Sequence, residues 1–61
     1  MRAADLPATK HYTGTVTWTH NGTTHAVHPF AIEHASGYTF LHYQTGRAHQ
    51  LKDEWEVEVS P

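Results

Sequence analysis

The sequence contains no cysteine, no long apolar run and only four basic residues among its 61. Without cysteine there is no disulfide to staple the fold, and a zinc site with thiolate ligands is excluded. No segment approaches the roughly 18 apolar residues that a membrane-spanning helix requires. The N-terminus also lacks the apolar segment of a secretory signal, so we expect a cytoplasmic protein that makes no membrane contact.

Positive charge is scarce as well. Four lysine and arginine residues against six acidic ones give a formal charge of −2 at neutral pH. A protein that binds a polyanion through charge alone normally has a clear basic excess, and this chain does not. It does contain seven histidines, and protonation of all of them would reverse the sign of the net charge.

The length is sufficient for one small domain. A chain of 61 residues lies near the lower limit for an independent hydrophobic core. Because no disulfide is available, we expect self-association to supply further stability and predict a homo-oligomer. Residues 1–10 have little to bury, and Pro7 disfavours helix at Leu6, so we expect a short mobile N-terminal arm there. The domain itself is predicted over residues 11–61.

A β-hairpin is the clearest local signal. Val16 and Trp18 alternate with threonines, which is the pattern of a strand with one buried face. Asn21-Gly22 follows, and this dipeptide favours the two-residue turn in which both residues have positive φ. Such a turn places Trp18 opposite His25 and Val16 opposite Val27, so that the apolar side chains share one face.

The residues from Tyr38 to Gln44 form the most aromatic run and predict a central strand covered on both faces. If Thr45-Gly46 alone makes the next turn, His42 lies opposite His49 on the neighbouring strand. Residues 55–59 alternate again and predict a half-buried final strand. Five short strands without a helical period indicate an all-β fold, a closed five-stranded small β-barrel of the SH3 or Sm-like type.

The chain contains five short segments in a recognisable order: Val16-Thr17-Trp18, Val27-His28-Pro29-Phe30, Gly37-Tyr38-Thr39-Phe40-Leu41, Gly46-Arg47 and Leu51-Lys52-Asp53. With these segments, residues 15–59 resemble the WYL domain, a module of bacterial regulators, and Thr39-Phe40-Leu41 stands where the family has Trp-Tyr-Leu. The resemblance implies an Sm-like barrel that binds a nucleotide or nucleic acid and usually accompanies a DNA-binding helix-turn-helix. This chain contains no helix-turn-helix, and Glu54 stands where the family typically has an arginine. Sm and Hfq-like RNA-binding rings share the barrel and are similar in topology.

No motif specifies a reaction. The four glycines lie at turns and a bend rather than in a phosphate-binding run, and no nucleophile, base and acid form a recognisable set. We therefore predict a protein that is not an enzyme and needs no cofactor. His42 and His49 are candidate metal ligands if they face each other, since opposed imidazoles on neighbouring strands are close enough to share an ion. The more ordinary interpretation is two surface histidines and no metal.

Aromatic side chains are the remaining functional candidates. Tyr38 and Tyr43 are predicted to stack on bases, with Arg47 and Lys52 in contact with phosphate. Trp18, Phe40 and Trp55 are expected in the core, because so small a domain needs its large side chains inside.

Two functions follow. The first is a regulatory module that binds a nucleotide or single-stranded nucleic acid. The alternative is a protein-interaction adaptor or inhibitor that docks through strand edges, because strands without charged side chains do little to block pairing with a partner.

Overall fold

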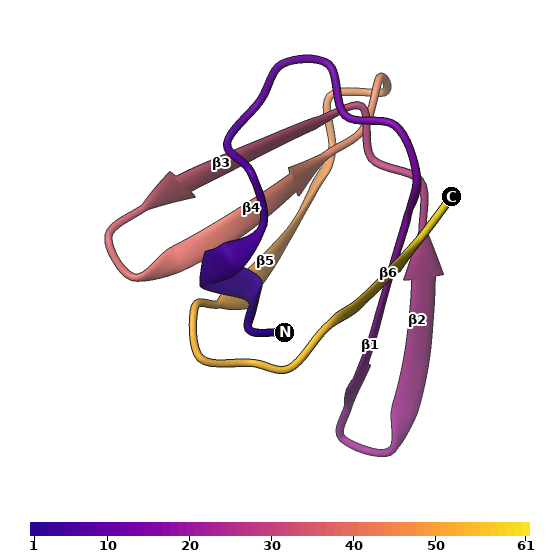
Figure 1. Cartoon of the computed structure of the whole chain (residues 1–61), viewed down its shortest axis with the longest axis vertical. Helices are drawn as coiled ribbons and strands as arrows, with labels where there is room; N and C mark the ends of the chain where they lie inside the picture. Colours follow the sequence, from indigo (N-terminus) through magenta and orange to yellow (C-terminus); the bar gives the residue numbers. More distant parts are fainter.

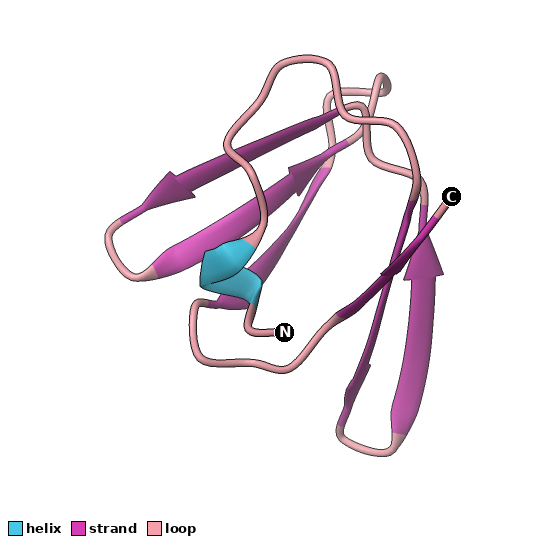
Figure 2. Cartoon of the chain, in the orientation of Figure 1, coloured by secondary structure: helices cyan, strands magenta, loops and turns pink.

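A computed structural model describes all 61 residues, and the fold is all-β apart from one turn of 3-10 helix. The strands form two separate three-stranded antiparallel sheets, β2-β1-β6 and β3-β4-β5 (Figures 1 and 2). The elements in chain order are η1 (Ala3–Asp5), β1 (Thr15–His20), β2 (Thr23–Val27), β3 (Ala31–Ala35), β4 (Tyr38–His42), β5 (Ala48–Lys52) and β6 (Glu58–Ser60).

The predicted β1–β2 hairpin is confirmed, with Val16 opposite Val27 and Trp18 opposite His25. Asn21 and Gly22 have φ of 51° and 77°, as the two-residue turn requires. Ser36 and Gly37 have φ of 53° and 83° and connect β3 to β4 by the same kind of two-residue turn.

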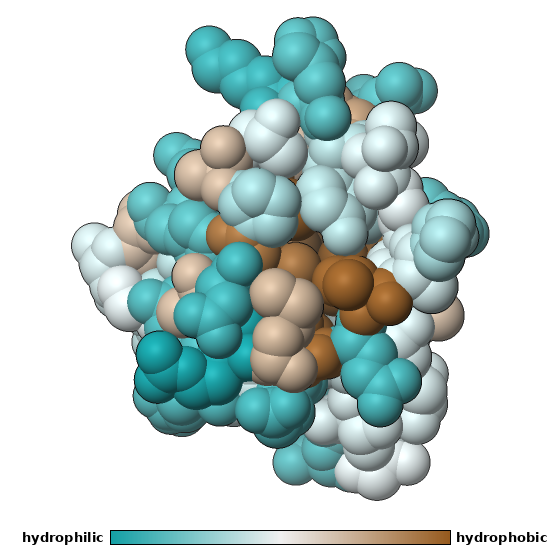
Figure 3. Space-filling model, viewed as in Figure 1, coloured by the Kyte–Doolittle hydropathy of each residue, from teal (hydrophilic) through white to brown (hydrophobic).

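The core lies between the inner faces of the two sheets. Val16 and Trp18 enter it from β1, and the N-terminal segment contributes two further side chains. In Figure 3, hydrophobic side chains gather near the middle of the face that shows the gap between the sheets. The buried apolar residues are Ala3, Leu6, Val16, Trp18, Ile32, Leu41, Leu51 and Val57.

The prediction of a mobile N-terminal arm is wrong, because residues 1–10 pack into the fold. Ala3 is fully buried and Leu6 is only 3% exposed. The amide of Ala3 donates a hydrogen bond to the carbonyl of Trp55 (2.8 Å). Thr9 pairs with Ile32 at the edge of β3, with backbone bonds in both directions. This segment therefore belongs to the same domain as the strands.

The same segment explains why the prediction of a closed five-stranded barrel is also wrong. The edge of β3 is occupied by Thr9, and the chain just before β6 forms a bridge to Arg2, with Glu56 as its partner. The N-terminal segment thus occupies the edge of β3 and lies against the chain before β6, and no strand of one sheet pairs with a strand of the other. The result is six strands in two sheets. Pro29, which has no N–H to donate to a ladder, lies in the segment that connects β2 of one sheet to β3 of the other.

The final strand is shorter than predicted. Only Glu58–Ser60 pairs with β1, although Val57 just before it is buried. Val59 is 48% exposed. Gly14 explains how closely this strand approaches the start of β1: its φ is 127°, and a Cβ there would lie 2.8 Å from the carbonyl oxygen of Ser60.

Candidate functional site

The outer face of the β3-β4-β5 sheet carries three aromatic rings in line, Tyr38, Phe40 and His42, which we call the outer row. Side chains alternate along β4, and Thr39 and Leu41, which point to the other face, are completely buried. The ring centroids are 6.4 Å apart from Tyr38 to Phe40 and 6.3 Å apart from Phe40 to His42. All three rings are partly exposed, so the expectation that both faces of this strand are covered is wrong, as is the placing of Phe40 in the core.

Alanines border the two ends of this row, whereas Phe40 in the middle lies between Glu33 of β3 and Gln50 of β5. His42 lies between Ala31 of β3 and Ala48 of β5, and Ala35 lies beside Tyr38. A methyl group does not reach over a neighbouring ring, so the alanines do not cover the rings at the ends of the row. Sheets that present partly exposed aromatic rings are typical of single-strand nucleic-acid binders.

Charged groups lie close to each end of the outer row. Lys52 pairs with Tyr38 across the β4–β5 ladder. At the other end, Nε2 of His42 lies 3.0 Å from a carboxylate oxygen of Glu33. His42 and Glu33 also line a groove of about 580 Å³ together with Lys10. The face thus combines two lysines with one carboxylate and is not acidic, although the chain as a whole is.

The predicted binding residues do not form one site. Tyr38 and Lys52 are neighbours on the outer face, but Tyr43 and Arg47 lie in the loop between β4 and β5, where the amide of Tyr43 donates to the carbonyl of Arg47 (2.8 Å). Tyr38 and Tyr43 are five residues apart, roughly 17 Å along an extended chain. The ring of Tyr43 packs edge-on against His49, with centroids 5.4 Å apart.

The pairing of His42 with His49 is also wrong. The loop from Tyr43 to Arg47 has five residues rather than two, which shifts the register by one and places His49 opposite Leu41. The two imidazoles therefore point to opposite faces of the sheet. No group of three or more His, Asp or Glu side chains in the chain is placed to hold a metal ion.

His49 instead belongs to a ring cluster at the inner side of the fold. Its ring contacts Trp18 edge-on at 5.0 Å and lies 5.8 Å from His25, which itself stacks on Trp18. Burial lowers the pKa of His49 below its ordinary value, and the positive charge of His25 lowers it further. Burial also raises the pKa of the Tyr43 hydroxyl. These contacts connect the two sheets, so the cluster supports the fold.

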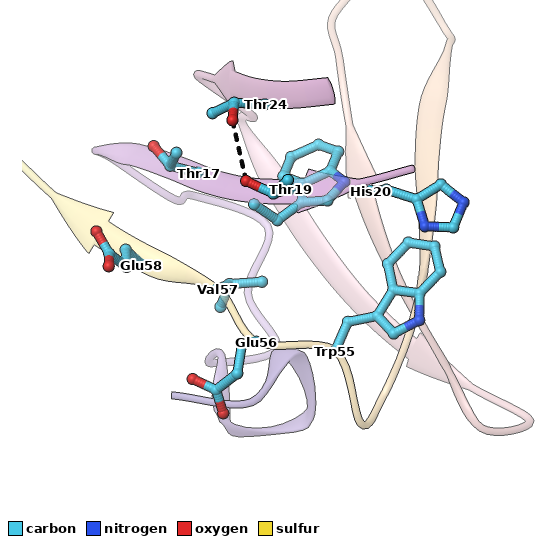
Figure 4. A pocket seen from close by; sticks show the side chains of 9 residues that line it. Thr17, Thr19, His20, Thr24, Trp55, Glu56, Val57 and Glu58 are labelled. Carbon is cyan, nitrogen blue, oxygen red and sulfur yellow. Dashed lines mark hydrogen bonds between the residues drawn. The ribbon is translucent and has the colours of Figure 1, made fainter. Parts of the chain in front are cut away.

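A second groove, of about 470 Å³, runs along β1 where β6 stops pairing with it (Figure 4). Trp55 forms one end of it and stacks on His20, with ring centroids 4.3 Å apart. Glu56 and Glu58 make its wall negative. Trp55 packs against the core but is only partly buried, so the expectation that it lies in the core holds in part. A negative groove repels phosphate, and the outer row is the better candidate for an anionic ligand.

Thr39, His34 and Asp53 form a partly buried polar cluster that supports the fold. The hydroxyl of Thr39 donates to Asp53 (2.8 Å) and contacts Nδ1 of His34 (2.9 Å). Thr39 has no exposed surface, so its hydroxyl is closed to a substrate.

Neither Phe40 nor His42 was predicted as a stacking residue. The two-residue period of β4 aligns both with Tyr38 on one face, but it does not say which face is exposed.

The chain has no match among family models, curated proteins or solved structures. The resemblance to the WYL domain accordingly remains a hypothesis from the sequence. No helix in the structure has the length and apolar character needed to cross a membrane.

Proposed function

We propose that this protein is a non-enzymatic binding module that holds single-stranded nucleic acid, or a nucleotide, on the outer row. The observation that carries the proposal is the line of three partly exposed rings at every second residue of β4, with alanines beside the two end rings. Each base offers an aromatic face, and stacking of one base on one aromatic side chain contributes about 1–3 kcal/mol. The suggested resemblance to the WYL domain points to the same class of ligand and to a regulatory role.

Lysines at both ends of the row support this ligand. Lys52 beside Tyr38 and Lys10 near His42 are placed to meet phosphates on either side of the stacked bases. The acidic side chains Glu56 and Glu58 line the groove on the other sheet. The net charge of −2 is therefore no measure of the local potential at the outer row. Arg47 and Tyr43, in the adjoining loop, are expected to contribute less than Tyr38 and Lys52.

The test is fluorescence anisotropy of labelled single-stranded DNA and RNA oligonucleotides with Phe40→Ala. We expect the variant to fold, since Phe40 is not part of the core, and to bind at least about fivefold more weakly. Val59→Ala is the control, because Val59 is an exposed apolar side chain on the other sheet. Equal binding by Phe40→Ala and the unaltered protein, or no binding to any oligonucleotide or nucleotide, would reject the proposal.

The contribution of charge is tested separately. Lys52→Gln should weaken binding and lower the dependence of log K on log salt concentration by about 0.7, the value for one phosphate contact on a single strand. Arg2→Gln removes the same charge at a position bridged to Glu56, away from the row, and should leave the slope unchanged.

A further inference from the structure

Four strands lie at the edges of the two sheets, and three of these edges are covered or charged. β3 is paired with Thr9. β6 carries Glu58, and the chain before it is bonded to the N-terminal residues. β5 ends in Lys52 and follows Arg47. Natural sheets use such covering and such charges to prevent pairing with another chain.

The edge of β2 has neither form of protection. In Figure 1, β2 is the outermost strand of its sheet, and it pairs only with β1. Its five residues, Thr-Thr-His-Ala-Val, include no lysine, arginine, aspartate or glutamate. The ladder with β1 is continuous, so no bulge twists the edge away.

The backbone groups on this edge can be identified from the alternation of an antiparallel ladder. Residues next to the two-residue turn form a hydrogen-bonded pair, so Thr23, His25 and Val27 direct their N–H and C=O groups toward β1. Those of Thr24 and Ala26 point outward. No backbone hydrogen bond outside the sheets involves either residue, and both side chains are exposed.

We propose that β2 pairs antiparallel with β2 of a second copy of this chain, which joins two β2-β1-β6 sheets into one continuous six-stranded sheet. This inference concerns the sheet opposite the outer row and goes beyond the proposed binding function. If all five residues pair, Thr24 of each copy lies opposite Ala26 of the other. The two-fold axis then passes between the two copies of His25. Each copy then both donates and accepts, which makes the edge self-complementary, as a two-fold interface must be.

The second copy is favoured over another protein because the edge is self-complementary in hydrogen bonding and has no lysine, arginine, aspartate or glutamate that would repel the same residue of the second copy. A two-fold axis brings identical side chains close together, and the outer face near the axis carries only threonines and Ala26. His25, at the axis itself, has its ring on the inner face, where it stacks on Trp18. A charged edge would repel its own copy there. A chain this small also gains more from extending its sheet than a larger domain does.

The experiment measures mass by sedimentation equilibrium across a wide range of protein concentration. We expect a monomer–dimer equilibrium in the unaltered protein. Ala26→Lys should raise the dimer dissociation constant by about tenfold or more, because it places a charged side chain at the pairing edge. Gln50→Lys, at the middle of the β5 edge, is the control and should leave the equilibrium unchanged.

Hydrogen exchange on the unaltered protein locates the interface without any substitution. The amides of Thr24 and Ala26 should become protected as concentration rises, whereas those of His25 and Val27 are already bonded to β1 in the monomer. A protein that stays monomeric at every concentration overturns the proposal. A dimer in which the Thr24 and Ala26 amides still exchange freely also overturns it, since that dimer uses another surface.

Discussion

The Nε2 atom of His34 lies 2.7 Å from the carbonyl oxygen of Leu6, a residue 28 positions earlier in the chain. This contact joins the N-terminal segment to β3. The other ring nitrogen of His34 contacts the buried hydroxyl of Thr39, which also binds Asp53. One imidazole and one hydroxyl thus connect the N-terminal segment, two strands of the sheet and the chain that follows β5.

Replacement of Thr39 by valine should therefore be costly. The change keeps the shape of the side chain but leaves His34 and Asp53 without their common partner, and we expect a loss of about 1–3 kcal/mol in the free energy of unfolding. Urea denaturation measures it. Thr24→Val is the matched control, because the Thr24 hydroxyl bonds only to Thr19 at an exposed site and its loss should cost less than about 0.5 kcal/mol. Equal losses in the two variants would contradict the role given to Thr39.

Leu6→Ala tests whether the N-terminal segment is part of the core. Leu6 is 3% exposed, and truncation of a buried leucine typically costs about 2–5 kcal/mol. Thermal and urea unfolding followed by tryptophan fluorescence should show that loss. Val59→Ala, at a 48% exposed position, should change stability little. A mobile arm, by contrast, would tolerate Leu6→Ala without effect.

Stability should decrease in mild acid because of His49. Its pKa in the folded protein lies below the ordinary value of 6.5, so as pH falls the unfolded chain takes up this proton first. The stabilising contribution is complete above the ordinary pKa and is lost as pH falls through the depressed folded-state value. Urea midpoints from neutral to mildly acid pH measure the loss. The loss of stability between neutral and mildly acid pH should be smaller in His49→Gln, where the titrating group is gone. It should be the same as in the unaltered protein in His11→Gln, a variant at an exposed histidine.

Glu33→Gln should strengthen binding of single-stranded nucleic acid. Glu33 pairs with Phe40 across the ladder and places a negative charge beside the stacking rings. Its removal should lower Kd roughly two- to fivefold at low salt, and the difference should shrink as salt is added. Glutamine keeps an acceptor for His42. Glu58→Gln makes the same change in net charge on the other sheet, and an equal gain there would show that only the overall charge matters.

The β1–β2 hairpin could be predicted in register because its determinants are local. Asn21-Gly22 specifies the turn, and the alternation of Val16 and Trp18 with threonines specifies the buried face. The β4–β5 pair could not be predicted in the same way. Thr45-Gly46 is only part of a five-residue loop, and a change of one in loop length moves every side chain of β5 to the other face. The predicted histidine pair depended on that single assumption.

Only part of the candidate site could be predicted from the sequence. The two-residue period of β4 aligned Tyr38 with Phe40 and His42, but which face of the strand meets the core is decided by what packs against it. Thr39 and Leu41 are fully buried among the other sheet and the N-terminal segment, which leaves the aromatic rings outside.

The sequence by itself thus determined an all-β chain, its Asn21-Gly22 turn and the register of its first hairpin, because these depend on neighbouring residues. The tertiary structure alone decided that residues 1–10 enter the core, that two sheets form instead of a barrel, and that the outer row is exposed. These outcomes depend on contacts between distant segments, such as Leu6 with His34 and Thr9 with Ile32, for which no local pattern exists.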